Sequence, residues 1–504
     1  MAIVTTRSVH VDRNCEVKKV IGIMVQSNSK SVATPSGSGS AGSMNGGLLP
    51  KMPTRSLPSV PRMRKIVGPG VIISAVGIGT GEYLLYPFIT SRVGLTFLWA
   101  AAIGLAFQYF INTEVARYTL ATGETILTGF LRLWRGWAPL FIVMTVVPFA
   151  WPAWMTSAAQ MITFPLGGGN VTWIAVGGLA LIGAVLTFSP VVYQTVEKLE
   201  MFKILMILAF AVLVVVLIGW RPWAEIPSAT MEGIGRLPAE VPTTVLLSAL
   251  IFAGGGGVVN LAVSNWARDK GWGMGIHAPR VVSPITGQEE AGSAAGYEFE
   301  VNDEELAKWK KWWTAVRVEQ FFTFYVVTLV TIVVFSVLAF STVTQGGYSG
   351  GADLGFIRFL GESLQEKYGA WLKLLFWSVG AISLTFANLV VVDMVARITS
   401  NILSTIYLSN HARWTEAKIY STVVWVMVAL GALILGLGLN QPFVLIAIAA
   451  ILNGLVMVVC CVLIIRVNGS LDRRIGISIG RRCAIALAAL VYAAFTTYTI
   501  TTFI

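Results

Sequence analysis

The chain has 504 residues, of which 55% are hydrophobic and only 12% are charged, and its mean hydropathy is +0.74. A soluble domain carries about twice that share of charged residues, so the composition excludes an ordinary soluble protein and predicts an all-α polytopic membrane protein. The formal net charge is +11, but its distribution along the chain argues against nucleic-acid binding, as shown below. Four cysteines and three histidines in this spacing indicate neither a disulfide framework nor a zinc site.

The first 60 residues contain no long apolar run and are rich in Ser, Gly, Thr and Pro. This composition predicts a disordered cytoplasmic tail over residues 1–60. A mitochondrial or chloroplast presequence is the alternative, because such peptides are also basic and Ser-rich. Asp12 and Glu16 weigh against it. We therefore assign residues 61–504 to a transmembrane domain.

Eleven apolar segments long enough to cross a bilayer as helices follow the tail. When the N-terminus is placed inside and the segments alternate, 30 of the 36 lysines and arginines lie on the inner side, as the positive-inside rule requires. The basic charge is thus explained by topology in a plasma or inner membrane, with the C-terminus on the side opposite the N-terminus. The predicted spans are 67–90, 94–119, 138–164, 171–193, 199–220, 242–267, 314–341, 370–397, 415–438, 442–466 and 480–502.

The longest inner loop is predicted at 268–313. Its last part, "NDEELAKWKKWW", has the pattern of an amphipathic helix with Asn302 or Asp303 as the N-cap. The Trp and Lys residues in it suit a membrane interface. We favour a solvated connector into the seventh span over a regulatory element.

Glycine runs occur at corresponding positions of two predicted spans. The first span contains "GIGTGE" (77–82) and the sixth contains "AGGGGVVN" (253–260). Each glycine costs about 1 kcal/mol in a helix relative to alanine, so both runs favour unwinding, although glycine also allows helices to pack closely. Transporters built from inverted repeats bind substrate where one helix of each half is interrupted. The runs therefore predict broken helices 1 and 6 of a five-plus-five inverted repeat, with halves at about 67–220 and 242–466 and an extra helix at 480–502.

Acidic residues inside membrane spans are candidates for function. Glu82 directly follows the first glycine run, where the alternative is a protonated or paired structural carboxyl. Glu114 precedes Arg117 by three residues and Asp393 precedes Arg397 by four, and helical side chains at these spacings form ion pairs. These four residues are therefore predicted to be structural ion pairs.

Two asparagines lie inside the eighth and tenth predicted spans, at Asn388 and Asn453. An amide exposed to lipid is costly, so both side chains are expected to face other helices. They either form helix–helix hydrogen bonds or line a transport pathway, and the pattern favours neither role.

The segment "GPGVIISAVGIGTGEYLLYPFITSRVGLTFLW" (68–99), with the later "ATGET" (121–125), resembles the first two spans of the Nramp family of divalent metal-ion transporters. The resemblance covers about 68–466 and is sharpest over 68–125. It implies a LeuT-like inverted-repeat fold, alternating access and transport of a divalent metal ion.

The chain departs from the family at its metal-binding motifs. The family's Asp-Pro-Gly-Asn motif falls on "GTGE" (79–82), so the first acid is missing and Glu82 stands at the Asn position. The family's Met-Pro-His motif has no counterpart, since Val258, Val259 and Asn260 occupy that neighbourhood, and the third span (139–164) contains no acid. An all-oxygen set without a thioether suits Mg²⁺, Ca²⁺ or Mn²⁺ rather than softer metals.

The sequence thus predicts a carrier of divalent cations with a bias toward harder ions such as Mg²⁺ or Mn²⁺, and no cofactor other than the transported ion. The lipid bilayer is the expected partner, and the pattern leaves the oligomeric state open. The predicted metal-binding residues are Glu82, Gly79, Thr80, Gly256 and Asn260, and the predicted pathway-lining residues are Tyr83, Tyr86, Ser264, Asn388 and Asn453.

Two other functions fit the same spans. A LeuT-fold carrier of a small organic solute would use Tyr83, Tyr86, Ser264 and Trp266 as a pocket, with Glu82 meeting an amine or carrying a coupling proton. A transport-inactive membrane sensor would use the inner loop as its output, but the chain contains no recognisable signalling domain. An enzyme is not expected, because we find no nucleophile–base cluster or phosphate-binding loop.

Overall fold

The computed structural model describes residues 49–279, 296–344, 348, 350–351, 353–408, 413–439 and 441–503. Leu48–Ile504 form one compact unit, and its described residues are mostly helical, with isolated bridge residues such as Thr54 and Glu298 as their β-structure. Nine helices or unbroken helical runs in this part are long and apolar enough to cross a membrane. The prediction of an all-α, multi-pass membrane protein is confirmed.

The helices of the first half of the chain range from single turns to 27 residues. In chain order they are α2 (Met63–Ile66), α3 (Pro69–Thr80), the π-helical turn η1 (Gly81–Leu85), α4 (Tyr86–Val93), the 3₁₀ turn η2 (Gly94–Phe97), α5 (Leu98–Thr122), α6 (Ile126–Leu133), α7 (Trp137–Phe149), α8 (Ala153–Thr163), α9 (Val171–Phe188), α10 (Val192–Ile218), α11 (Arg221–Ala224) and α12 (Ile226–Gly233).

The second half contains the longest helix, α18, and several π-helical turns. Its elements are α13 (Thr243–Ile251), α14 (Val258–Lys270), the 3₁₀ turn η3 (Gly273–His277), α15 (Asp303–Glu319), the π-helical η4 (Gln320–Val326), α16 (Val327–Ala339), the π-helical η5 (Phe340–Thr344), α17 (Gly355–Tyr368), α18 (Ala370–Ile402), the π-helical η6 (Leu403–Tyr407), α19 (Glu416–Gly436), α20 (Pro442–Gly469) and α21 (Ile479–Phe503).

The nine candidate spans differ from the eleven predicted ones for two local reasons. The run Pro69–Thr122 is continuous, so it contains both the first and the second predicted span. The sixth predicted span is divided into α13 and α14, and each is shorter than the 18 residues that a candidate span needs. The count of eleven therefore stays a prediction.

The prediction extends the disordered tail too far along the chain. Residues 1–48 lie outside the described residues, but residues 49–62, here called the N-terminal segment, are packed against the rest of the domain. Leu57 is only 1% exposed and its amide donates to a carboxylate oxygen of Glu305 at 2.7 Å. Thr54 pairs with Glu298 in an isolated bridge. These contacts join to the domain a segment that composition alone assigns to a tail.

The predicted inner loop 268–313 is also too long. The preceding helix, α14, continues to Lys270, and α15 begins at Asp303 because the Asn302 side chain accepts a hydrogen bond from the Glu305 amide at 2.9 Å. Asn302 rather than Asp303 is thus the N-cap. The middle of the loop, 280–295, lies outside the described residues.

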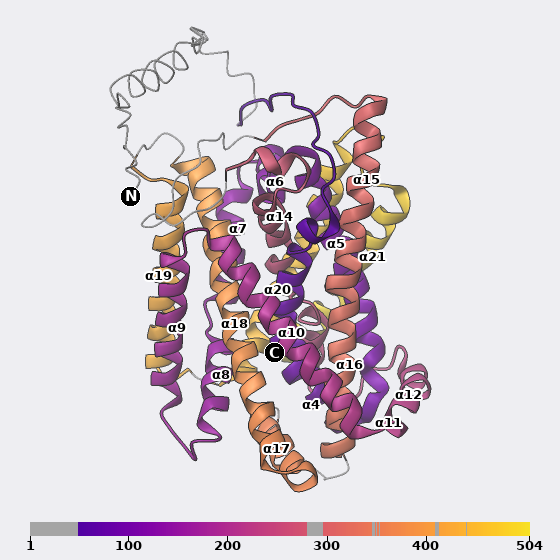
Figure 1. The fold of residues 1–504 in the computed structure, drawn as a ribbon, viewed down its shortest axis with the longest axis vertical. Coiled ribbons are helices and arrows are strands. Elements are labelled where there is room, and N and C mark those ends of the chain that lie inside the picture. Colours follow the sequence, from indigo (N-terminus) through magenta and orange to yellow (C-terminus); the bar gives the residue numbers. More distant parts are fainter. Residues whose placement is uncertain are drawn as a thin grey trace, which may run out of the picture. The chain divides into compact units, whose positions relative to one another are not determined.

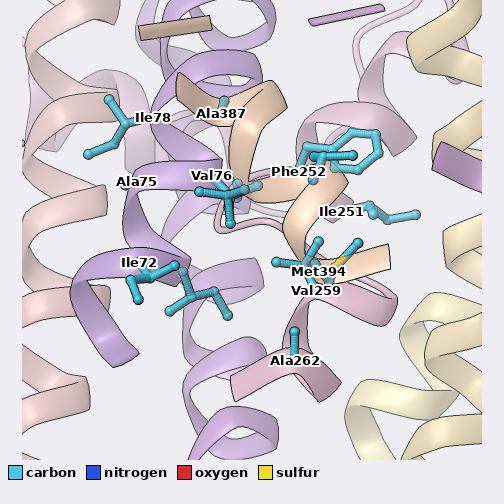
Figure 2. Close-up of a cluster of buried hydrophobic side chains, with 14 of the residues drawn as sticks. Ile72, Ala75, Val76, Ile78, Ile251, Phe252, Val259, Ala262, Ala387 and Met394 are labelled. Carbon is cyan, nitrogen blue, oxygen red and sulfur yellow. The ribbon is translucent and has the colours of Figure 1, made fainter. Parts of the chain in front are cut away.

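Helix α18 is central to the packing. It contacts α3, α8, α10 and α19, and α10 also contacts α3 and α16 (Figure 1). The interior between α3, the α13–α14 junction and α18 is apolar, and Figure 2 shows side chains from all three converging there. Apolar side chains therefore form part of the surroundings of the site described next, and all the labelled ones are buried: Ile72, Ala75, Val76, Ile78, Ile251, Phe252, Val259, Ala262, Ala387 and Met394.

Candidate substrate site at two interrupted helices

The first interruption lies in α3. Ile78 has a ψ of 59°, which is not helical, and the chain continues as the π-helical turn η1. Two backbone carbonyls beside the interruption are bound by side chains of other helices. The Ser383 hydroxyl of α18 donates to the Ile78 carbonyl, and the Lys203 ammonium of α10 donates to the Ala75 carbonyl. The irregular backbone is thus satisfied inside the protein, as a membrane interior requires.

The second interruption is the stretch 252–257 between α13 and α14. Gly255, Gly256 and Gly257 have φ values of +107°, +61° and +62°, in the left-handed region that glycine tolerates best. The glycine run is therefore needed for a loop conformation, whereas close packing alone would leave the helix intact. The glycine run of the sixth predicted span lies in this loop, and the broken helices of an inverted repeat stay a prediction.

Gln108 and Asn453 bridge this loop. The Gln108 side chain donates to the Ile251 carbonyl at 2.9 Å and accepts from the Gly256 amide at 3.1 Å, so it binds both edges of the gap. Asn453 Oδ1 accepts from the Val258 amide at 3.3 Å. The amides of Gly256 and Val258, at the N-terminal end of α14, therefore already have acceptors.

The two interruptions are in direct contact. A Cβ atom on Gly81 would lie 2.3 Å from the Phe252 carbonyl oxygen, and one on Gly77 would lie 3.0 Å from both Gly254 Cα and Glu82 Oε1. Only glycine permits this approach without moving a backbone. The turn η1 accordingly packs against α13.

Glu82 lies at this contact and is fully buried, at 0% exposure. Among the described residues no side chain donates a hydrogen bond to its carboxylate, which interacts with the backbone amides of Gly79 and Glu82 and, electrostatically, with Lys203. The Thr80 hydroxyl and Asn260 Oδ1 are likewise buried without a partner in this part of the chain. A carboxylate in such a place is costly unless another group binds it.

The other predicted ligands differ in how they relate to Glu82, and the Gly79 backbone amide interacts with its carboxylate. Gly79 packs toward Ala387 of α18, where a Cβ would lie 3.0 Å from the Ala387 side chain. The Asn260 amide group donates to Asn112 Oδ1 at 2.6 Å, and within the described part of the chain no hydrogen bond joins it to Glu82. The structure thus brings Glu82, Gly77 and the 252–254 backbone together and ties Asn260 to α5.

The predicted pathway-lining tyrosines differ from each other. Tyr83 stacks on Phe376 with ring centroids 4.9 Å apart and donates its hydroxyl to the Phe376 carbonyl, so it packs against α18. The Tyr86 hydroxyl is buried without a hydrogen-bond partner in the described part of the chain, and Tyr86 interacts electrostatically with Glu82. Of the two, only Tyr86 keeps the polar group expected of a lining residue.

Most of the remaining predicted pathway-lining residues use their polar groups in hydrogen bonds within the protein. Ser264 donates to the Leu261 carbonyl of its own helix at 2.6 Å, and Trp266 donates to Asp393 at 3.4 Å. Asn453 joins two helices through the bond that it accepts from α14, and its amide nitrogen donates to the Ala449 carbonyl of its own helix at 2.9 Å. Asn388 is buried, and its amide nitrogen has no partner among the described residues.

Both predicted ion pairs are present. Arg117 lies 2.7 Å from Glu114, which also binds Arg481 of α21. Arg397 lies 2.8 Å from Asp393. Each carboxylate therefore has a structural partner, as expected from its spacing.

Arg397 also binds Asp269 of α14, and Tyr420 of α19 donates to Asp393 at 2.7 Å. This cluster connects α14, α18 and α19. It is a larger network than the i,i+4 spacing in α18 predicts.

Sequence reasoning missed Gln108, Asn112, Glu200 and Lys203. Gln108 and Asn112 are four residues apart in an otherwise apolar part of α5, and Glu200 and Lys203 are three apart in α10. That spacing places each pair on one helix face and is the signal that could have found them. The predicted topology assigns Lys203 to the inner side, but the residue is fully buried inside α10.

No protein-family model matches the chain, and no curated protein is significantly similar to it in sequence. Solved structures are similar in fold. A mutant of the Eremococcus coleocola manganese transporter matches with a TM-score of 0.63 and 12% identity over 90% of both chains, and the same transporter with an aromatic bis-isothiourea compound matches with a TM-score of 0.63 and 11% identity over 90% of both. MhsT in complex with L-phenylalanine matches with a TM-score of 0.50 and 12% identity over 88% of this chain and 99% of that one.

At these identities the similarity concerns the fold, and the neighbours are membrane transporters rather than enzymes. The resemblance in residues 68–125 and the likeness in fold agree. The chain is therefore an integral, multi-pass membrane protein whose fold is similar to that of these solved transporters.

Proposed function

We propose that this chain is a membrane transporter that moves divalent metal cations by alternating access, with a bias toward hard ions such as Mg²⁺ or Mn²⁺. The proposal depends on the chemistry of the buried side-chain atoms that have no hydrogen-bond partner at the two interruptions. Within residues 77–82 and 252–260 the buried side-chain atoms without a partner are all oxygens, those of Thr80, Glu82 and Asn260. The backbone amides of Gly256 and Val258 already have acceptors. A buried carboxylate and an unpaired amide oxygen, beside two backbone amides that already have acceptors, favour a cation over an anion.

Oxygen chemistry supports a hard ion. Carboxylate, amide, hydroxyl and carbonyl oxygens suit Mg²⁺, Ca²⁺ and Mn²⁺, and Mg²⁺ keeps several waters and is often bound through only one or two carboxylates. Glu82 would supply the negative charge, and the Ala253 carbonyl lies near the same point in the contact between the interruptions. The likeness in fold to a protein described as a manganese transporter supports the same class of cargo.

The transport cycle we propose uses eleven spans, with the N-terminus inside and the halves 67–220 and 242–466 as inverted repeats. The distribution of Lys and Arg supports this topology. Interrupted helices in corresponding positions of both halves support a site near the middle of the bilayer. The cargo would reach Glu82 from each side in turn.

The test is divalent-ion binding and flux with the full-length purified protein. Isothermal titration should detect Mg²⁺ or Mn²⁺ binding to wild type, and proteoliposomes should take up the same ion. Glu82→Gln should weaken binding at least about tenfold, the equivalent of about 1.4 kcal/mol. Glu225→Gln, at an exposed acid outside the candidate spans, is the matched control and should bind like wild type. Absence of divalent binding to wild type, or equal binding to Glu82→Gln, would exclude the proposal.

A carrier of a small organic amine is the second candidate. One observation favours it: within the described residues no group of three His, Cys, Asp or Glu side chains is arranged to hold a metal. A single carboxylate such as Glu82 can instead bind one ammonium group. A thermal-shift screen of divalent metals against amines and amino acids would separate the two, and an absence of liposome flux with every ligand would indicate a sensor.

A further inference from the structure

Three arginines meet where α15 and α21 both pack against α5 (Figure 1). They are Arg117, Arg317 and Arg481, here called the arginine cluster. Their guanidinium carbons lie over the ring of Trp313, at 3.8, 5.6 and 5.1 Å from its centroid. In the predicted topology each arginine lies near the inner end of its span. The cluster thus gathers positive charge from three helices at one point of the inner membrane surface.

The described residues neutralise only part of this charge. Glu114 binds both Arg117, at 2.7 Å, and Arg481. Arg317 forms no ion pair within the described part of the chain, and its Nε is buried there without a hydrogen-bond partner. Arg117 is within electrostatic reach of both other arginines, so the like charges repel one another. Three guanidinium groups therefore share one carboxylate, and an anion would relieve the excess.

The arginine cluster borders a surface that faces the bilayer. Val318, Phe321 and Phe322 follow Arg317 in the same candidate span and are 38%, 41% and 58% exposed. Apolar side chains exposed together in a membrane-spanning run are placed to contact acyl chains. The side chain of Arg481 is 15% exposed, so the cluster can be reached from outside the protein.

Further basic side chains surround the arginine cluster. Lys310 is exposed and precedes Trp313 and Arg317 by three and seven residues, so it lies on the same face of α15. Arg482, next to Arg481, is also exposed. Basic pockets between membrane helices on the cytoplasmic side are a recognised form of binding site for anionic lipid headgroups. A guanidinium group suits this task because its planar fork matches a phosphate.

We propose that the arginine cluster binds the phosphate group of an anionic phospholipid of the inner leaflet, whose acyl chains lie along Val318 and Phe322. Arg317 makes the main contact, because its charge has no carboxylate partner in the described part of the chain. The exposed apolar side chains beside it favour a lipid over a soluble phosphate, which could not use them. The lipid connects α5, α15 and α21 and stabilises the folded carrier. No residue of this site belongs to the two interruptions.

The first test compares anions on wild-type protein. Thermal unfolding is recorded in detergent micelles without divalent ions, after addition of phosphatidylglycerol, phosphatidylcholine or inorganic phosphate at equal concentration. Phosphatidylglycerol should raise the midpoint in a concentration-dependent way, since a ligand that binds only the folded state stabilises it. The other two should leave it unchanged. An equal rise with phosphatidylcholine would exclude a site for anionic headgroups, and an equal rise with inorganic phosphate would exclude a lipid site.

The second test assigns the site to Arg317. Phosphatidylglycerol binding to the full-length protein is titrated by native mass spectrometry, and Arg317→Gln should weaken the tightest binding at least about tenfold. Its unfolding midpoint without lipid should stay near that of wild type, because the substitution breaks no ion pair of the described residues. Lys198→Gln removes the same charge from an exposed position on the predicted inner side of α10 and should bind lipid like wild type.

Equal weakening in both variants would reduce the effect to overall charge and overturn the assignment. Wild-type lipid affinity in Arg317→Gln would overturn it as well. If Arg317→Gln does not fold, the comparison of lipids on wild-type protein decides. All these measurements are made without divalent ions, so they succeed or fail independently of Mg²⁺ or Mn²⁺ binding at Glu82.

Discussion

The backbone of Gly81 lies directly against the carbonyl group of Phe252, so that a Cβ atom at Gly81 would be only 2.3 Å from the Phe252 oxygen. This contact joins the interruption of the first helix to that of the helix formed by α13 and α14. Because the neighbouring atom is backbone, no side-chain rotation can make room for a methyl group. The contact makes the two interruptions one structural unit, with Glu82 one residue after the glycine.

Gly81→Ala should therefore separate the two interruptions. We expect a loss of stability of about 1–3 kcal/mol, typical of overpacking, and a large loss of cargo binding. Gly177→Ala is the control, since a methyl group on Gly177 of α9 would have no described atom within 4 Å and its φ is not left-handed. It should be neutral or stabilising by up to about 1 kcal/mol. Thermal unfolding and ligand titration of both variants check this, and wild-type binding by Gly81→Ala would contradict it.

Gln108 should be required for the second interruption. Gln108→Ala leaves the Ile251 carbonyl and the Gly256 amide without their present partner, and each buried unpaired group costs about 1–3 kcal/mol. We expect a lower unfolding midpoint and weaker cargo binding. Gln194→Ala, at an exposed glutamine of α10, should leave both unchanged. Equal midpoints for the two variants would show that the loop does not depend on Gln108.

The glycine runs could be predicted as interruptions because their cause is local. Glycine alone tolerates the left-handed φ values found at 255–257, and that preference is visible in any sequence. The partners of the interruptions could not be predicted in the same way. Whether Gln108 or Lys203 faces the interruption depends on how α5 and α10 are rotated and packed, which one sequence does not specify.

The different orientations of Tyr83 and Tyr86 have a further local cause. The turn 81–85 is π-helical, and its wider turn shifts the following side chains around the helix relative to an α-helix. An α-helical wheel drawn through "GEYLLYP" therefore does not give the relative orientation of the two tyrosines. In the structure Tyr83 packs on Phe376, and Tyr86 interacts electrostatically with Glu82.

Arg397 should be among the residues least tolerant of substitution. It lies between Asp393 and Asp269, and all three side chains are 0% exposed. Removing one partner of a buried ion pair costs about 3–5 kcal/mol, because the remaining charge is left unpaired. Arg397→Ala should thus sharply lower the unfolding midpoint. As a control, Arg358→Ala breaks an exposed pair with Glu362 and should lower the free energy of unfolding by only about 0–1 kcal/mol. Similar losses of stability in both variants would contradict the structural role of Arg397.

The N-terminal segment should detach from the domain as the pH falls. The Arg55 guanidinium lies 3.3 Å from His277 Nδ1 and over the Tyr297 ring at 4.6 Å. Partial burial, and secondarily the Arg55 charge, lower the pKa of His277 below its ordinary value. The neutral imidazole is therefore the form that fits the folded state. The contact is stable above the ordinary histidine pKa of about 6.5, and its contribution is lost as the pH falls from there through the lower pKa of the folded state.

Hydrogen exchange of the Thr54–Leu57 backbone at pH 7.5 and 5.5, corrected for the intrinsic rate, measures this detachment. We expect weaker protection at the lower pH in wild type. His277→Gln keeps an acceptor for Arg55 but cannot take up a proton, so its protection should not change with pH. If His277→Gln shows the same pH response, a group other than His277 causes the detachment. His277 is the only histidine within the residues that the structure describes.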